Sequence, residues 1–258
     1  PVVISKLSFT AMGLVDTAMV GRLGLVEQGA VGIATTYMFT VYVFGLGLLG
    51  VVNTYVSQYH GAGRERACGL VLGQGVRLAV IAGSITLAIV LASAPLFRMA
   101  GLSEVVSELG YRYRFWRSLG VAGVFGYWAY NGFLEGIGHT RTPMIIALVA
   151  NVVNIVLDAL LIFGLGPFPE LGVAGAGIAT AASNLFMLGC FVVVVHRRNS
   201  PYRRFAVERV HEKIVWPLVR GMNRVGLPMG FQFFFEVGAY LVISIMVGWI
   251  GDIELSAN

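Results

Sequence analysis

Apolar stretches of about twenty residues, separated by short polar breaks, constrain this chain more than any other feature of its sequence. A helix needs roughly 20 apolar residues to cross the hydrocarbon of a membrane, whereas a barrel strand needs about ten of alternating polarity. Only 12% of the 258 residues are charged and 57% are hydrophobic, while soluble domains carry about 25% charged residues. These figures exclude a soluble domain, a disordered chain, collagen and a disulfide scaffold. The predicted fold class is all-α integral membrane.

Seven spans are predicted, and the breaks between them contain glycine, proline and charge. The spans cover residues 1–20, 30–55, 72–97, 113–134, 143–164, 173–195 and 228–250. The first six form a predicted N-terminal transmembrane lobe over residues 1–196. A basic amphipathic linker over residues 197–227 is then followed by the start of a second lobe over residues 228–258.

The distribution of basic residues predicts the orientation. Eight of the 18 Lys and Arg residues lie between Arg197 and Arg224, and such a loop is expected to be cytoplasmic. Counting back six spans also places the N-terminus in the cytoplasm. Arg112, Arg114 and Arg117 oppose this assignment, because they would lie near the outer side.

Hydrophobic residues interleaved with charge over residues 203–222 predict an amphipathic helix along the inner membrane surface. A polar linker with some helicity is the alternative interpretation of this segment.

The chain contains a candidate internal repeat. A shift of 227 positions places Pro1 on Pro228 without gaps, and nine of the 31 comparable positions are identical. Six spans separate the copies, so both copies enter the membrane in the same direction, as in parallel transporter repeats. The second copy stops after one helix. We therefore expect a fragment, with the first helix of a second lobe, from a protein of about twelve spans.

Acidic and amide side chains inside the spans are candidates for a functional site, because charge at membrane depth is costly. Asp16 lies late in the first span. In the fifth span, Asn151, Asn154 and Asp158 have i, i+3 and i+7 spacing, which places them on one helix face. Their oxygens suit sodium or a proton. Solvation of Asp16 and helix packing through the asparagines are the alternatives.

Two further polar groups lie in the sixth and seventh spans. Thr180 and Asn184 have i, i+4 spacing, and a packing role is their alternative interpretation. Gln232, Glu236 and Tyr240 repeat every four residues, and an acid such as Glu236 is hard to explain by packing alone. Lys6 could pair with an acid of a neighbouring helix or extend to the membrane surface.

No motif for nucleotide hydrolysis or enzymatic catalysis is apparent. Residues 61–64 lack the spacing and the lysine of a phosphate-binding loop. No metal motif or nucleophile elbow is visible, and two cysteines far apart in the sequence indicate neither a disulfide framework nor a metal site. We therefore expect no enzyme and no cofactor, and an ion gradient is the natural source of energy.

Several segments resemble the multidrug and toxic compound extrusion (MATE) family. Residues 15–24 resemble its first-helix signature and residues 135–144 resemble its fourth-to-fifth loop. The resemblance to its fifth helix lies in residues 151–164 and the resemblance to its sixth in residues 172–180. The resemblance to its seventh helix lies in Leu227-Pro228 followed by Glu236. These motifs occur in the right order along the whole chain, and the type they resemble is NorM-like and bacterial.

The resemblance implies a twelve-helix antiporter of two lobes, working by alternating access. It would export cationic amphipathic compounds in exchange for Na⁺ or H⁺, as a multi-pass monomer of the bacterial inner membrane without a nucleic-acid partner. The family's N-lobe cation site maps to Asp16, Asn154, Asp158 and Thr180, with Na⁺ possible at the first three. Pro1 matches the proline of a bent first helix, and Glu236 matches a seventh-helix acid.

Other functions remain open on the sequence alone. A lipid or oligosaccharide flippase of the same wider superfamily would share the spans and the repeat, but its cavity is expected to be basic. A membrane scaffold would have no reason to bury Asp158 and Glu236, and a channel would need a pore loop. The sequence does not distinguish sodium coupling from proton coupling.

Overall fold

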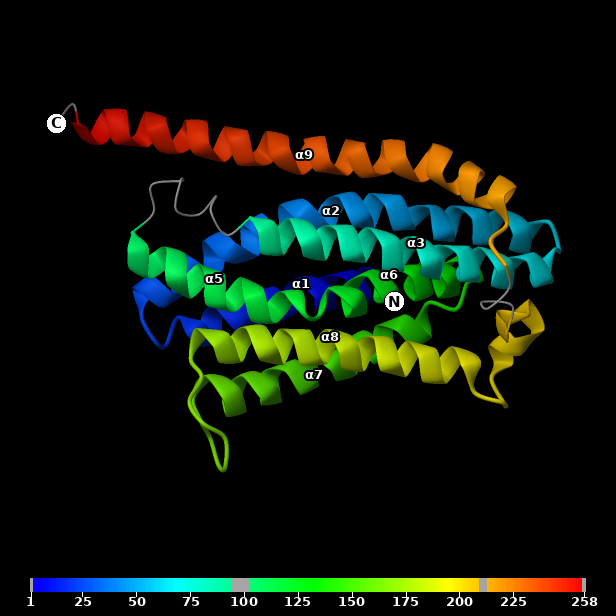
Figure 1. The fold of residues 1–258 in the computed structure, drawn as a ribbon, viewed down its shortest axis with the longest axis horizontal. Helices are drawn as coiled ribbons and strands as arrows, with labels where there is room; N and C mark the ends of the chain where they lie inside the picture. Colours follow the sequence, from blue (N-terminus) through cyan, green and yellow to red (C-terminus); the bar gives the residue numbers. More distant parts are fainter. Residues whose placement is uncertain (1, 94–102, 209–212, 257–258) are drawn as a thin grey trace.

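The computed structural model describes residues 2–93, 103–208 and 213–256, and this part of the chain is helical without strands (Figure 1). The predicted all-α class is therefore confirmed. The helices are α1 (Val2–Val20), α2 (Leu25–Gly61), α3 (Glu65–Ala92), α5 (Glu104–Ser118), α6 (Val121–Gly136), α7 (Arg141–Ile162), α8 (Val173–His196), the 3₁₀ turn η1 (Pro201–Phe205) and α9 (Trp216–Ser256).

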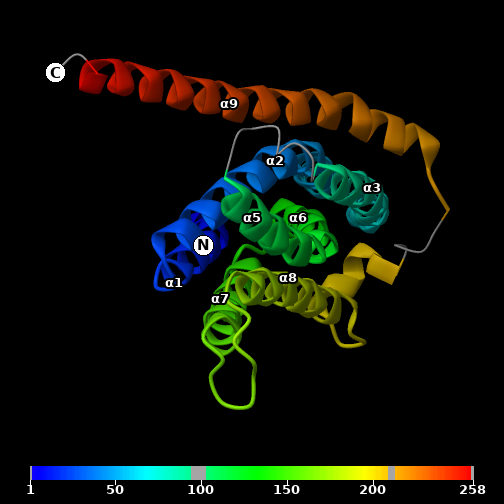
Figure 2. The same ribbon diagram turned by 60° about the vertical axis from the view of Figure 1, so that its left-hand side comes forward.

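The helices from α1 to α8 pack as one elongated bundle, and α9 lies along its side (Figure 2). Helix α2 contacts α3, α5, α6 and α9, while α7 packs between α1 and α8. Most of the apolar core lies between α2, α3, α6 and α8. A smaller apolar cluster around Val20, Tyr113 and Ile162 lies at the end where α2, α5 and α8 begin. The predicted orientation places this end outside the cell, and it is called the predicted outer end below.

Four described helices are long and apolar enough to cross a membrane, namely α2, α3, α7 and α8. These helices correspond to the predicted second, third, fifth and sixth spans. Helix α2 extends five residues before and six residues after the predicted 30–55 segment. The integral membrane class is thus supported by helix length as well as by composition.

The predicted single span over residues 113–134 is divided between two helices, α5 and α6, and both junction residues keep right-handed helical backbone angles. Helix α5 already begins at Glu104, where the Ser103 hydroxyl accepts a hydrogen bond from the Val106 amide over 3.4 Å. The break lies at Leu119 and Gly120. A Cβ on Gly120 would lie 2.7 Å from Ala181 Cα, so glycine allows close contact with α8 at the break.

The predicted amphipathic helix over residues 203–222 is not one continuous helix: residues 213–215 are not helical, residues 216–222 belong to α9, and residues 209–212 lie outside the described part of the chain. Residues 201–205 form the turn η1, and the Phe205 side chain is fully buried. Its ring lies 5.6 Å from the His60 ring and 6.0 Å from the Phe133 ring. The apolar residues at the start of this segment therefore pack into the bundle rather than onto a lipid surface.

Helix α9 begins twelve residues before Pro228, which sequence reasoning takes as the start of the seventh span. Pro217 stands in its first turn, where proline is well tolerated because the first amide groups have no helical partner. Pro228 lies inside the helix. Proline is tolerated within membrane helices when neighbouring groups satisfy the freed carbonyl. The division of the chain into a lobe, a linker and a second lobe stays a prediction.

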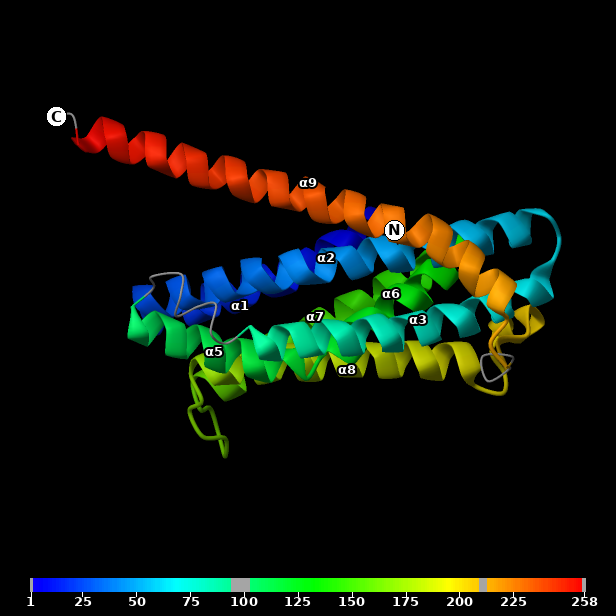
Figure 3. The ribbon, with the colours of Figure 1, turned by 45° about the horizontal axis from the view of Figure 1, so that its top comes forward.

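Glycines bring α9 against α2. A Cβ on Gly47 would lie 2.5 Å from the Met229 carbonyl oxygen and 2.7 Å from Gly230 Cα. The Phe44 and Phe231 rings meet edge to face beside this contact, with centroids 5.2 Å apart. Further along, α9 diverges from the bundle (Figure 3).

Candidate functional site

Asp16 of α1 is the centre of a buried polar cluster near the predicted outer end. Its side chain is 0% exposed. One carboxylate oxygen accepts hydrogen bonds from the Tyr113 hydroxyl over 3.1 Å and from the Thr180 hydroxyl, and the other accepts one from the Asn154 amide over 3.4 Å. Donors from three helices, α5, α7 and α8, thus satisfy this buried carboxylate.

Asp158 of α7 lies beside this cluster in a different environment. It is also 0% exposed, but neither of its carboxylate oxygens has a hydrogen-bond partner among the described residues. Asp16 is close enough for its charge to act on Asp158. A hydrogen bond between the two carboxyl groups would require a proton on one of them. Asp158 is therefore the acid that gains most from a proton or another cation.

Tyr113 connects the acids to a second set of polar groups on α2 and α5. Its hydroxyl accepts hydrogen bonds from Arg117 over 2.6 Å and from the Thr35 hydroxyl over 3.3 Å. Arg117 also donates to the Thr35 hydroxyl over 3.1 Å. The single proton of the Tyr113 hydroxyl is thus available for the hydrogen bond to Asp16. Sequence reasoning does not connect Tyr113, Arg117 or Thr35 with the acids.

Glycines in α8 position Thr180 close to the acids. A Cβ on Gly175 would collide with the Leu161 backbone of α7, and one on Gly177 would lie 2.6 Å from the Tyr113 carbonyl oxygen of α5. Because neither residue carries a side chain, α8 approaches both helices. Thr180 follows one turn after Gly177, so its hydroxyl faces α1 and the site.

Two polar residues predicted to support the site lie outside its hydrogen bonds. The Asn151 side chain is half-buried and donates to the Ala147 carbonyl of its own helix over 2.8 Å. Asn184 is buried, and its backbone lies against Gly123 of α6. Its side-chain oxygen has no partner in the described residues. These two residues contact other parts of the lobe.

Two predicted residues of the seventh span, Gln232 and Glu236, do not join the cluster. Gln232 and Glu236 lie on the part of α9 beyond its glycine contact with α2, and both are exposed. The Tyr240 and Lys6 side chains and Pro1 lie outside the described residues. Their predicted roles stay predictions.

The atoms of the cluster that could coordinate a cation are carboxylate, amide and hydroxyl oxygens. Hard cations such as sodium prefer these oxygens over nitrogen or sulfur. No group of three or more His, Cys, Asp or Glu side chains is found among the described residues, so a transition-metal site has no support there. The cluster can bind a proton or a small hard cation.

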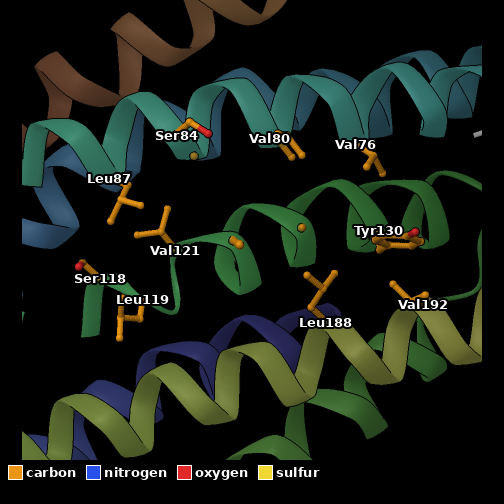
Figure 4. A pocket seen from close by; sticks show the side chains of 14 residues that line it. Val76, Val80, Ser84, Leu87, Ser118, Leu119, Val121, Tyr130, Leu188 and Val192 are labelled. Carbon is orange, nitrogen blue, oxygen red and sulfur yellow. The ribbon is translucent and has the colours of Figure 1, made fainter. Parts of the chain in front are cut away.

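A separate pocket of about 290 Å³ lies between α3, α8 and the junction of α5 and α6 (Figure 4). Its lining is mostly apolar, with Ser84, Ser118 and Tyr130 as polar exceptions. None of the predicted site residues lines it. We therefore place the candidate site in the polar cluster around Asp16 and not in this pocket.

Comparison with known proteins assigns the family. The MatE family model matches residues 1–160. The multidrug resistance protein MdtK of Cronobacter sakazakii is 28% identical over 262 residues, which cover 100% of this chain and 56% of that protein. A probable multidrug resistance protein NorM of Bradyrhizobium diazoefficiens is 31% identical over 261 residues, covering 100% and 55%.

Solved structures agree with this assignment. A MATE protein in the bent conformation has a TM-score of 0.78 and 25% identity, over 89% of this chain and 50% of that one. An inward-facing multidrug resistance MATE family transporter of the MOP superfamily has a TM-score of 0.77 and 25% identity, over 89% and 51%.

The chain therefore belongs to the MatE family, whose members are membrane transporters and not enzymes. This confirms the resemblance seen in its sequence motifs. The chain spans about half the length of the curated relatives it matches.

Proposed function

We propose that this chain forms the N-terminal lobe of a secondary active antiporter. The antiporter exports cationic amphipathic compounds in exchange for Na⁺ or H⁺ by alternating access. The names of the relatives, which are multidrug resistance proteins, support export of drugs. The inward-facing state of a similar multidrug transporter structure supports alternation between an inward-facing and an outward-facing state.

The main observation for ion coupling is that the two buried acids differ in their hydrogen-bond partners. Asp16 has three hydrogen-bond donors, whereas Asp158 has none among the described residues. A cation bound between them would relieve both the repulsion of two buried carboxylates and the missing partner of Asp158. Ion binding would then stabilise one conformation of the lobe and substrate binding the other, which couples the two fluxes.

A lipid or oligosaccharide flippase is the second candidate function. The observation in its favour is the presence of Arg114 and Arg117 inside the lobe, because anionic phosphates require basic partners. However, Arg117 donates its hydrogen bonds to Tyr113 and Thr35, and the Arg114 guanidinium lies 5.5 Å from the Tyr37 ring centroid. Both arginines therefore have partners within the lobe, which favours the antiporter.

The test uses the full-length parent protein in proteoliposomes with a fluorescent cationic dye. A sodium gradient and a pH gradient are imposed in turn, and the gradient that drives dye movement identifies the coupling ion. We expect Asp158→Asn to abolish this movement. Asn151→Ala is the matched control, since it alters the same helix outside the hydrogen bonds of the site. Full dye movement in Asp158→Asn would refute coupling at this pair.

The same vesicles separate the two candidate functions. No dye movement under either gradient, with the protein correctly inserted, would favour the flippase. Labelled lipid-linked sugars would then be the cargo to assay.

A further inference from the structure

Arg117 is a positive charge within the same network as the two acids, and the proposed ion exchange assigns it no role. It lies one helical turn after Tyr113 on α5. Its guanidinium donates to the Tyr113 hydroxyl over 2.6 Å, and its carbon lies 5.4 Å from the centroid of that ring. A second hydrogen bond of 3.1 Å to Thr35 fixes the guanidinium against α2.

The direction of the hydrogen bonds connects this charge to Asp16. A guanidinium only donates, and a phenol has a single proton. Because Tyr113 accepts from Arg117 and from Thr35, its proton points to Asp16, which it meets over 3.1 Å. The positive charge thus reaches the carboxylate through one bridging hydroxyl. Among the described residues Arg117 forms no direct ion pair with either acid.

This arrangement changes the charge balance of the candidate ion site. Two ionised carboxylates and one guanidinium, which stays charged at any physiological pH, leave a net charge of one negative unit. Arg117 is also close enough to Asp16 for their charges to interact directly. An incoming cation is attracted by the acids and repelled by the arginine, so the arginine weakens its binding.

Weaker binding has a functional consequence for an exchanger. A site with two uncompensated buried carboxylates would hold a cation so tightly that release would limit turnover. A fixed counter-charge lowers the affinity without removing a ligand. It also needs no direct contact with the ion, since the tyrosine hydroxyl transmits its effect.

We propose that Arg117 is a positioning residue that acts through Tyr113 and sets how tightly the Asp16–Asp158 pair holds the coupling cation. This inference rests on the ion exchange proposed above. It adds one residue to that proposal and states the expected sign of its effect. Loss of the positive charge at position 117 strengthens cation binding and slows cation release.

The test measures dye transport by the full-length parent protein at increasing concentrations of the coupling ion. In Arg117→Gln, we expect the ion concentration for half-maximal transport to fall about tenfold, as expected for two charges a few ångströms apart in a partly buried site. The maximal rate should fall as well, because release becomes slower. Arg117→Lys keeps the positive charge but lacks the planar guanidinium group. It should restore the half-maximal ion concentration towards that of the unmodified protein.

Two controls distinguish this effect from a purely structural role. Thr35→Val removes the hydrogen bonds of Thr35 with Arg117 and Tyr113 but no charge, so it should leave the half-maximal ion concentration within about twofold. A structural clamp would instead predict equal losses of rate in Thr35→Val and Arg117→Gln at unchanged ion affinity. That result would overturn the inference, as would an unchanged or increased half-maximal concentration in Arg117→Gln.

Asp158→Asn shows which proposal has failed. If Asp158→Asn abolishes ion-driven transport and Arg117→Gln leaves ion affinity unchanged, the role of Arg117 is refuted while the proposed function stands. If Asp158→Asn transports normally, the ion site is refuted, and the role of Arg117 with it.

Discussion

The two groups of acidic residues predicted for this chain have opposite surroundings. Asp16 and Asp158 are fully buried among four helices of the bundle, and three of these helices provide hydrogen-bond donors to Asp16. Glu236 lies on α9, beyond the contact of that helix with α2, and its side chain is exposed. An acid pair completed within one lobe can bind an ion by itself, whereas an exposed acid needs partners from elsewhere. This difference in surroundings is the reason for proposing ion binding at the first group rather than at the second.

The largest effect is expected from Asp16→Asn. This change removes the charge that accepts three hydrogen bonds and leaves Tyr113 and Thr180 donors facing an amide. Ion-driven transport should fall by about 100-fold or more, because broken buried charge networks are among the most costly changes. Transport rates in vesicles with equal amounts of inserted protein measure this effect. Activity near that of the unmodified protein would show that the cluster only stabilises the fold.

A smaller effect, on ion affinity, is expected from Tyr113→Phe. The substitution keeps the ring and removes the hydroxyl that donates to Asp16 over 3.1 Å. A hydrogen bond to a charged group contributes about 1.5–3 kcal/mol, so loss of the hydroxyl that transmits the Arg117 charge should lower the ion concentration for half-maximal transport by about tenfold or more. Tyr37→Phe, which alters another tyrosine of the lobe, is the comparison variant. Equal effects in both would contradict a specific role of the bridging hydroxyl.

Glu236→Gln tests whether the exposed acid on α9 takes part in ion binding. We expect the transport rate to fall by roughly a few fold, because an exposed acid can still attract a cationic substrate. The ion concentration for half-maximal transport should stay unchanged, since Glu236 is not part of the buried pair. An ion titration of the variant provides both values. A shift of the half-maximal ion concentration as large as that of Tyr113→Phe would show that α9 contributes to the ion site.

The smallest effect is expected from Arg112→Gln, on the same helix as Arg117. Arg112 is exposed and forms an i, i+4 salt bridge of 2.9 Å with Glu108. Exposed pairs contribute about 0–1 kcal/mol, so ion affinity and thermal stability should remain within error of the unmodified protein. A change in ion affinity would indicate that surface charge, rather than the buried network, controls the site.

The sequence indicates the acids of the site better than their surroundings. Charge at membrane depth marks Asp16 and Asp158, and helical spacing together with the MATE resemblance adds Asn154 and Thr180. The structure brings these four residues together, although their role in ion binding remains a proposal. The same spacing also includes Asn151, whose amide donates to a carbonyl of its own helix instead of to the acids; its supporting role stays a prediction. Helical spacing predicts which residues share a helix face, but it does not predict which group an asparagine side chain bonds to.

Tyr113 and Arg117 are missed for a different reason. Sequence reasoning treats Arg112, Arg114 and Arg117 as basic residues on the wrong side of the membrane, which weakens the predicted orientation. In the structure α5 packs against α2 and α8, so Arg114 and Arg117 lie inside the lobe. The i, i+4 spacing of Tyr113 and Arg117 was the available signal. The break at Gly120 depends on contact with α8, and a tertiary contact of this kind leaves no local pattern.

The most direct test of the account is equilibrium ion binding to the full-length parent protein. Radioactive sodium binding is measured for a sodium-coupled protein, and proton release on addition of a cationic substrate for a proton-coupled one. The account predicts that Asp158→Asn abolishes the signal and that Glu236→Gln retains it. Retention in Asp158→Asn together with loss in Glu236→Gln would contradict the claim that the buried pair of this lobe binds the coupling ion.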